Sequence, residues 1–443
     1  MKKVLCIAYY FPPMGLSGVQ RTVKFLKYLP EFGWEPSVLT VKGTAYWAYD
    51  ESLFGDLRSE MQIVRTGSLD PLRLIALLPR GAGKQGKMGL VPSEVIRRGF
   101  SWWNHALFVP DNKIGWMPFA LFRASRWLSE ASPSVDLIYA TAPPFTAHLV
   151  GAILSAQFEE PLVLDFRDPW SRNQFVSYPT PYHRLLNRAL ERACLRQAEA
   201  CIATNEGIIE GLRENALVRR PRLEVVPHGF DPEDFEGHPT SPLTHSPAEA
   251  YSVQGPERFT ITHSGSFYER ITPRYFLQAL RRLLDERPEV EERIRARFVG
   301  LFRRENEELV RTLQLEQVVE VTSYVPHRKS VEYLLSSDVL WFMIGEGPSS
   351  ASWAPGKLFE YIGARKPILA CVPEGTAART VRATGNGMVV PPDNVDQIKG
   401  AIWRYYKAWL NGTLLETDRE VVQQYDRRRL TGVLAGIFED ALS

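Results

Sequence analysis

The chain has 443 residues, of which 44% are hydrophobic and 23% charged, an ordinary balance for a globular protein. This length is too great for one core, so about two or three domains are expected. The net charge of +2 excludes a chain-wide nucleic-acid-binding polyelectrolyte, and any basic surface must therefore be local. The four cysteines form no CxxC pair, which predicts free buried thiols in a reducing cytosol.

The N-terminal half alternates short apolar runs with longer amphipathic stretches. The apolar runs predict strands at 3–10, 35–41, 135–141, 161–168, 200–205 and 222–229. The amphipathic stretches predict helices at 18–33, 145–158 and 183–198. Strands that alternate with helices in this way indicate a parallel sheet with right-handed crossovers.

Residues 70–104 fit this alternation poorly and predict an insertion. Six Lys and Arg residues stand there against two acidic residues, interleaved with Leu, Ile, Phe and Trp. Such a surface suits anionic lipid headgroups, and the alternative is an insertion that packs on its own domain. "GAGKQGKM" at 81–88 has phosphate-loop spacing, but Met88 stands where magnesium needs Ser or Thr, so we do not interpret it as a nucleotide loop.

Residues 230–257 are rich in Pro, Ser, Thr and acidic residues and read as a linker. After the linker the alternation restarts, with strands expected at 258–265, 295–300, 318–325, 338–344 and 366–372. The sequence therefore predicts an α/β protein with two doubly wound, Rossmann-like domains that face a cleft. Ligands of such sheets bind at the carboxyl ends of the strands.

The first expected strand is followed by "FPPMGLSGVQR", in which Gly15 and Gly18 precede a helix. Glycines allow close approach to the backbone, and the N-terminus of a helix attracts anions. The pattern indicates one half of an anion site, and a tight turn without a ligand is the alternative.

A second charged stretch, "LDFRDPW", brings Asp165, Arg167 and Asp168 to the carboxyl end of an expected strand. Asp168 could accept a proton from an attacking hydroxyl, and Arg167 could hold an acid or a phosphate. The alternative is a structural Asp–Arg pair.

The second domain carries the stronger anion signals. Arg270 stands before a helix, where it could neutralise a leaving diphosphate. Gly356 and Lys357 lie at the expected start of another helix, so backbone amides, helix dipole and ammonium converge. Glu360, one turn later, could accept two ribose hydroxyls, with a solvated helix face as the alternative.

Five segments occur in an order that resembles one enzyme family: "YYFPPMGLSGVQR", "DFRDPW", "VPHGFD", "HSGSFY" and "GKLFEYIGARKPIL". Nearly the whole chain resembles a GT-B, family 4 bacterial glycosyltransferase of the exopolysaccharide or O-antigen type. The resemblance implies an acceptor domain at 1–229, a nucleotide-sugar-binding domain at 258–420, and a helix within 421–443 that returns to the N-terminal domain.

The resemblance also implies roles for single residues. Glu360 matches the second carboxylate of the family's Glu-x7-Glu motif, while the first falls on Ser352, which leaves the donor sugar open. Ser266 stands in place of a usual Arg, and Arg270 is similar to the family's Lys. A catalytic-region His of many relatives aligns near Arg167.

These correspondences define the predicted site. We expect Asp168, Arg270 and Lys357 to act in catalysis, with Asp168 on the acceptor side. The residues expected to bind the donor or acceptor, with Tyr324 and Val325 closest to the base, are Gly15, Gly18, Arg167, His228, Gly265, Ser266, Tyr324, Val325, Ser352, Gly356, Leu358 and Glu360.

The implied reaction transfers a sugar from a nucleotide-diphosphate sugar to a hydroxyl of a glycan or lipid-linked glycan, with retention and without a metal or other cofactor. Cleft closure would bring the two glycine loops onto one diphosphate. A cytoplasmic protein is expected, with possible peripheral binding to an anionic membrane through 73–103 and no nucleic-acid partner. Two alternatives remain: a nucleotide-sugar epimerase using Asp168, His148 or His228, and a non-enzymatic partner with an impaired donor site.

Overall fold

The structure is a computed structural model that describes residues 1–15, 17–43, 50–69, 107–130, 135–172, 178–216, 221–236, 258–267, 270–347 and 350–443. The expected basic insertion at 70–104, its phosphate-loop-like segment at 81–88, and residues 237–257 of the expected linker lie outside the described residues.

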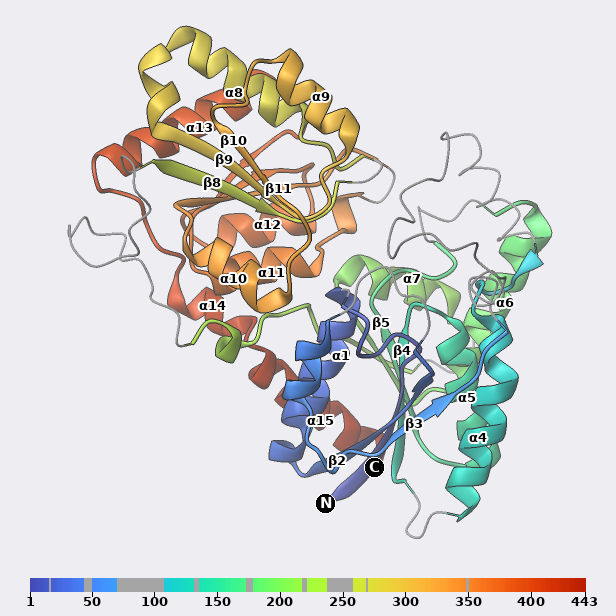
Figure 1. Cartoon of the computed structure of the whole chain (residues 1–443). Coiled ribbons are helices and arrows are strands. Elements are labelled where there is room, and N and C mark those ends of the chain that lie inside the picture. Colours follow the sequence, from blue (N-terminus) through green and yellow to red (C-terminus); the bar gives the residue numbers. More distant parts are fainter. Residues whose placement is uncertain are drawn as a thin grey trace, which may run out of the picture. The chain divides into compact units, whose positions relative to one another are not determined.

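The chain divides into two compact units, each with its own parallel sheet. Unit 1 comprises Met1–Pro227 and Thr431–Ser443, and unit 2 comprises His228–Leu430. Unit 1 holds a seven-stranded sheet and unit 2 a six-stranded sheet (Figure 1). The prediction of an α/β fold with two parallel-sheet domains is confirmed.

The sheet of unit 1 has the order β3-β2-β1-β4-β5-β6-β7. The order reverses between β1 and β4, which is the position where doubly wound sheets bind ligands. Every residue of β4 and β5 is buried, and most of these residues are apolar, as expected for central strands covered on both faces. The strands are β1 (Lys2–Ile7), β2 (Trp34–Val41), β3 (Ile63–Thr66), β4 (Leu137–Ala142), β5 (Leu162–Phe166), β6 (Ala200–Ala203) and β7 (Arg222–Val225).

Helices cover both faces of this sheet (Figure 1). The helices α4 (Met117–Glu130), α5 (Thr146–Phe158) and α6 (Pro181–Gln197) lie on one face, and α1 (Ser17–Tyr28) and α15 (Arg427–Ala441) lie on the other. Phe438 of α15 holds its ring 5.1 Å from that of Trp34 on β2 and 5.5 Å from that of Tyr139 on β4. The last turns of the chain are therefore part of the core of unit 1. The other helices among the described residues of unit 1 are η1 (Leu29–Phe32), η2 (Glu51–Asp56), η3 (Ile114–Trp116) and α7 (Glu206–Asn215).

The sheet of unit 2 repeats this plan in the order β10-β9-β8-β11-β12-β13, with its reversal between β8 and β11. The central strand β8 is buried along its whole length. The strands are β8 (Phe259–Ser264), β9 (Ile294–Val299), β10 (Val319–Thr322), β11 (Val339–Met343), β12 (Ile368–Cys371) and β13 (Met388–Val390).

Two apolar clusters fill the two faces of this second sheet. One joins it to α8 (Arg274–Glu286) and α13 (Val395–Leu410), and the other joins it to α10 (His327–Leu335), α11 (Gly356–Gly363) and α12 (Thr376–Ala383) (Figure 1). The remaining helices are α9 (Arg304–Thr312), α14 (Arg419–Gln424), η4 (Pro232–Asp234), η5 (Pro288–Arg293) and η6 (Ser350–Ser352).

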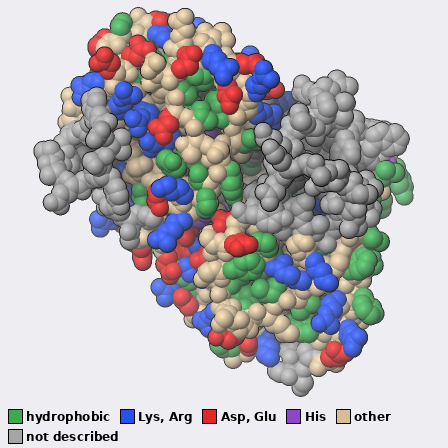
Figure 2. Space-filling model, viewed as in Figure 1, with side chains coloured by type: hydrophobic (Ala, Val, Ile, Leu, Met, Phe, Trp, Pro, Cys, Tyr) green, Lys and Arg blue, Asp and Glu red, His purple; other side chains and the backbone are tan. Residues whose placement is uncertain are grey.

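The mixed charge of the surface and the free cysteines are as expected from the near-zero net charge and the absence of a CxxC pair. Figure 2 shows basic and acidic side chains interspersed over the visible face of the described residues. All four cysteines are free and buried. Among the described helices, none has the length and apolar character needed to cross a membrane.

Candidate active site

In unit 2, the loop after the central strand β8 forms one wall of the predicted donor site. Gly265 follows β8 directly, and its N–H donates to the carbonyl of Val299 at 2.8 Å. A Cβ on Gly265 would lie 3.0 Å from Nε2 of His263 and 3.3 Å from both Cδ and Cε of Lys357. The side chain of Lys357 thus lies across a backbone position that only a glycine fills without displacing a neighbour.

Lys357 enters this place from the first turn of α11. Its side chain is half-buried, and it makes no hydrogen bond or ion pair with any described residue. Burial lowers the pKa of Lys357, and the nearby Glu360 carboxylate partly opposes that effect. A half-buried lysine whose ammonium has no partner, placed in the first turn of a helix, is an arrangement that an anionic group would stabilise.

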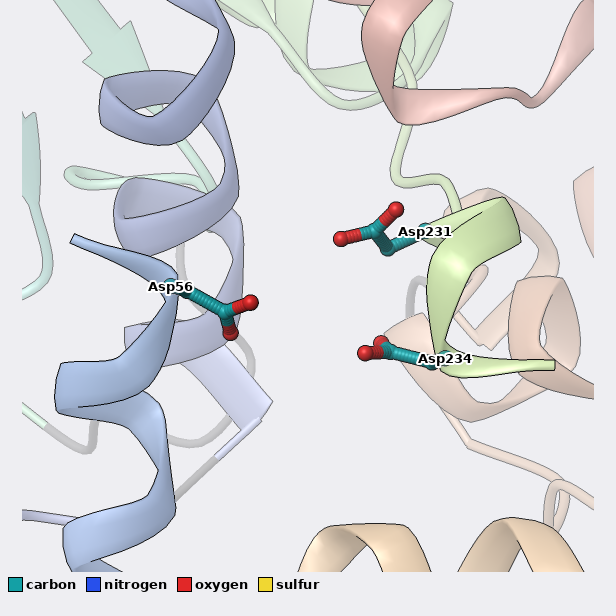
Figure 3. A group of neighbouring side chains, drawn as sticks. All are labelled: Asp56, Asp231 and Asp234. Carbon is teal, nitrogen blue, oxygen red and sulfur yellow. The ribbon is translucent and has the colours of Figure 1, made fainter. Parts of the chain in front are cut away.

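Glu360 lies one turn further along α11 and is 8% exposed. His327, at the start of α10, holds Nδ1 4.0 Å from Oε1 of Glu360 and Nε2 3.1 Å from Oδ2 of Asp234. Asp231 and Asp234 point their carboxylates to the same side of η4 (Figure 3). The imidazole of His327 therefore lies between two carboxylates of unit 2, one of which is the predicted ribose ligand.

Arg270, predicted to meet the diphosphate, lies against the loop that follows β11. Its Nη1 donates to the carbonyl of Glu346 at 2.6 Å. A Cβ on Gly347 would come within 2.9 Å of the same nitrogen. Arg270 thus lies against Glu346 and Gly347, whereas Lys357 lies beside Gly265.

The other predicted residues of unit 2 line the ends of several strands and helices. Ser266 is exposed directly after Gly265, and Tyr324 is 51% exposed beyond the end of β10 with the half-buried Val325 after it. Ser352 ends η6 and is half-buried.

The start of α11 holds two more of them, Gly356 and Leu358. Leu358 is fully buried in the apolar cluster of α11, which makes it a core residue. A Cβ on Gly356 would lie 4.0 Å from Nδ1 of His228, which brings these two predicted residues together.

In unit 1, Asp165 is the centre of a buried polar cluster. Arg21 of α1 donates to its two carboxylate oxygens at 3.0 Å each, and both side chains are 0% exposed. Tyr139 and Thr141 of β4 donate to Oδ2 at 2.8 and 3.1 Å. Burial alone would raise the pKa of Asp165, but the charge and hydrogen bonds of Arg21, together with Arg167 and Tyr139, lower it overall. The cluster therefore fixes α1 to the centre of the sheet.

Arg167 binds backbone carbonyls through each of its guanidinium nitrogens. Nε donates to Ala142 at 3.1 Å, while Nη1 and Nη2 donate to Gly18 and Pro143. A Cβ on Gly18 would lie only 2.5 Å from Nη1 of Arg167. The structure thus brings together two predicted residues, Gly18 and Arg167, and ties the start of α1 to the loop after β4.

Asp168 follows Arg167 and is half-buried, with no hydrogen bond to its carboxylate among the described residues. Burial raises the pKa of Asp168, and Arg167 only partly opposes this. Gly15 lies half-buried in the loop before α1. Beside β5, His148 is fully buried, and its burial lowers its pKa to about 4. The carboxylate of Asp168 is consequently a better candidate for proton transfer than the imidazole of His148.

Sequence reasoning did not select two histidines that lie beside predicted residues. His263 stands in the quoted "HSGSFY" segment, and His327 stands in the loop expected to meet the base. His263 lies near Lys357, and His327 lies near Glu360, because β8 and α10 pack against α11. The hydrophobic periodicity of the sequence does not specify that packing.

Residues 18–229 match the family described as "Glycosyl transferase 4-like domain", and residues 258–408 match "Glycosyl transferases group 1". No curated protein matches the sequence. A glycosyltransferase from Rickettsia africae has a similar structure, with 14% identity and a TM-score of 0.61 over 100% of this chain and 99% of that one.

Two further solved structures are similar. Anabaena HepE in complex with UDP and glucose has 16% identity and a TM-score of 0.58, over 98% of this chain and 99% of that one. A putative UDP-N-acetylglucosamine 2-epimerase from Listeria monocytogenes has 12% identity and a TM-score of 0.55, over 99% of this chain and 98% of that one. At these identities the likeness shows a shared fold, and the two family matches carry the assignment of activity. The chain belongs to the GT-B glycosyltransferases of the family 4-like type.

Proposed function

We propose that the protein transfers a hexosyl group from a nucleotide-diphosphate sugar to a hydroxyl of a glycan or lipid-linked glycan, with retention of anomeric configuration. The observation that carries this proposal is the half-buried Lys357 at the start of α11: its ammonium has no hydrogen-bond or ion-pair partner among the described residues, and Gly265 leaves the backbone beside it open. Anabaena HepE, which shares the fold, has been solved with UDP and glucose.

Unit 2 would hold the donor. Lys357 and the first amides of α11 would bind the diphosphate, and Glu360 would accept hydrogen bonds from the ribose hydroxyls. The base would stack near Tyr324, whose ring is half exposed beyond β10. Arg270 would add positive charge if its guanidinium turned from the carbonyl of Glu346 toward the leaving group.

The chemical step in this proposal needs few side chains. The acceptor oxygen bonds to the anomeric carbon as the bond from that carbon to the phosphate oxygen breaks. The hydroxyl proton passes to the departing phosphate oxygen on the same face. Positive groups fixed before the reaction stabilise the charge that develops on the diphosphate, so neither a metal nor another cofactor is required.

Unit 1 would supply the acceptor side. Asp168, whose carboxylate has no hydrogen-bond partner among the described residues, would orient the acceptor hydroxyl. Arg167 would act indirectly, because its guanidinium already binds three backbone carbonyls and so holds the start of α1 in place. We further propose a cytoplasmic protein that reaches lipid-linked acceptors at the membrane surface through residues 70–104, which liposome co-sedimentation with and without anionic lipid would test.

An epimerase acting on a nucleotide sugar is the second candidate, because a putative epimerase from Listeria monocytogenes shares the fold. It would need an acid and a base, and the low pKa of the buried His148 argues against that residue. Sugar product formed without any acceptor would favour the epimerase. A non-enzymatic partner would fail to bind nucleotide diphosphates, which calorimetry would reveal.

The test of the donor site compares nucleotide-diphosphate binding in Lys357→Met with binding in Lys407→Met, an exposed lysine of α13. We expect the first substitution to weaken binding about tenfold or more, since hydrogen bonds to charged groups contribute roughly 1.5–3 kcal/mol. The second should leave affinity unchanged. Equal effects of both substitutions would reject Lys357 as a diphosphate ligand.

A further inference from the structure

His263 carries an acceptor that the described part of unit 2 leaves unused. Its Nδ1 lies 3.1 Å from the carbonyl of Trp341, an acceptor, so Nδ1 carries the proton and donates it. Nε2 therefore carries a lone pair and can accept a hydrogen bond, but it is buried without a hydrogen-bond partner among the described residues. Burial of an unpaired acceptor costs roughly 1–3 kcal/mol, so a partner is to be expected in the working protein.

The unused acceptor lies beside an unused donor. The position of a Gly265 Cβ would be 3.0 Å from Nε2 of His263 and 3.3 Å from Cε of Lys357. The ammonium is one bond beyond Cε, so rotation about the last bonds of the lysine can carry it toward Nε2 while the backbone of Gly265 stays in place.

The ring of His263 is held in one orientation. It stacks on Phe267, with ring centroids 4.6 Å apart and planes 20° from parallel. The side chain is 5% exposed. Together with the bond to Trp341, this stacking fixes the direction of the Nε2 lone pair.

We propose that His263 is a positioning residue for Lys357: the Nε2 lone pair accepts a hydrogen bond from the Lys357 ammonium and keeps it charged beside Gly265. The importance of this contact for catalysis rests on the proposed function, in which Lys357 binds the donor diphosphate.

The surrounding charges are consistent with this role. Burial, and then the charge of Lys357, lower the pKa of His263 to about 3, so the ring remains a neutral acceptor at physiological pH. Burial also lowers the pKa of Lys357, and Glu360 on the same helix opposes it. Tyr361, also on α11, is a further titratable group beside this loop: its hydroxyl accepts a hydrogen bond from the N–H of Ser264 at 2.7 Å, and burial raises its pKa, so it stays neutral. His327, beyond Glu360, lies 4.0 Å from the carboxylate and not beside the ammonium.

Two substitutions separate positioning from structural support. His263→Asn places an amide N–H where Nδ1 was and keeps the bond to Trp341, but removes the acceptor at Nε2. His263→Gln places an amide oxygen where Nε2 was and keeps that acceptor, but loses the bond to Trp341. If His263 only supports the fold, His263→Gln should be the more damaging substitution, because it loses the bond to Trp341. If His263 positions Lys357, His263→Asn should be the more damaging one, because it loses the acceptor for the ammonium.

The first readout is the titration of Lys357 in the free protein, followed by NMR of isotope-labelled lysine side chains and assigned by its loss in Lys357→Arg. We expect His263→Asn to lower the midpoint by about one pH unit and His263→Gln to leave it nearly unchanged. This measurement needs no donor, so it remains informative if the proposed function is wrong.

The second readout is the affinity for UDP as a function of pH. A lysine binds anions below its pKa, so the pH at which affinity falls should move down by about one unit in His263→Asn. In a Lys357→Arg background, where the charge cannot titrate in this range, His263→Asn should leave the profile unchanged. A midpoint that moves with His263→Gln instead, or an effect that persists with Arg at 357, would overturn the inference. Failure of the wild type to bind UDP would count against UDP as the donor nucleotide and leave the titration to decide.

Discussion

Substitution of Gly18 tests whether the start of α1 serves turnover or nucleotide binding. A Cβ in Gly18→Ala would lie 2.5 Å from Nη1 of Arg167 and 3.3 Å from its Cζ. Carbon atoms normally keep about 3.5 Å from such neighbours, so the guanidinium must move by about 1 Å. Its bonds to the carbonyls of Gly18 and Pro143 would then be lost or weakened.

The size of the effect follows from these two bonds. Each hydrogen bond to a charged donor contributes roughly 1.5–3 kcal/mol, so about 2–4 kcal/mol is expected after partial relaxation. That is less than the typical total stability of about 5–15 kcal/mol, so the protein should remain folded. A displacement of about 1 Å near reacting groups can reduce turnover up to a hundredfold. Nucleotide affinity should change less than about twofold, because the proposed donor site lies in unit 2.

The assay compares turnover, nucleotide affinity and thermal unfolding for Gly18→Ala with those for Gly436→Ala. Gly436 is an exposed helix residue of unit 1 with open space at its Cβ, so its substitution should be harmless or slightly stabilising. In an Arg167→Ala background, Gly18→Ala should add little, because the clashing atoms are gone. Equal losses of turnover and affinity, or full additivity with Arg167→Ala, would refute the reasoning.

Four further predictions concern buried and charged groups. Asp165→Asn should destabilise unit 1 by about 3–5 kcal/mol in chemical denaturation, because it leaves the buried charge of Arg21 unpaired. The control Asp440→Asn, which breaks the exposed pair with Arg222, should cost at most about 1 kcal/mol. Similar losses of stability in the two variants would contradict the buried-pair argument. Since the folded-state pKa of Asp165 is lowered, its contribution should be complete above an unfolded pKa of about 4 and decline as pH falls below that value, and a pH-independent difference between wild type and Asp165→Asn would oppose this. Glu360→Gln should weaken nucleoside-diphosphate binding about tenfold while Glu420→Gln, on exposed α14, leaves it unchanged, as measured by calorimetry; equal affinities would remove Glu360 from the site. The four cysteines, which are buried and have raised pKa values, should resist alkylation at pH 8 in the native protein and react after unfolding, and rapid labelling of the native protein would contradict this.

The alternation of strands and helices could be predicted because burial leaves a direct mark on the sequence. Central strands such as β4 are buried throughout and mostly apolar, since helices cover both faces of a parallel sheet. Helix α4 and the short outer strand β3 were not among the predicted elements. They adjoin residues 70–104, whose composition reads as an insertion and hides the alternation.

The candidate site could also be predicted only in part from the sequence. Gly265 and Lys357 could be selected from the sequence because glycines and lysines that follow strands are typical of anion sites. That the Lys357 side chain lies against the backbone of Gly265 depends on tertiary packing, which the sequence pattern does not show. Arg167 shows the limit most clearly. Its charge suggested a ligand for an acid or phosphate, yet its donors reach carbonyls of residues 18, 142 and 143, which no sequence pattern indicates. The acceptor at Nε2 of His263 depends on a bond to Trp341, 78 positions away.

The central claim is that this chain transfers sugar from a nucleotide-diphosphate donor to a separate acceptor. The most direct measurement is nucleotide release from a panel of nucleotide sugars, each incubated with and without lipid-linked and soluble glycan acceptors. The account predicts that at least one donor releases nucleotide in an acceptor-dependent manner, and that Lys357→Met reduces this release strongly while Lys407→Met does not. Failure of every donor to bind, or conversion of the donor sugar with no acceptor present, would contradict it.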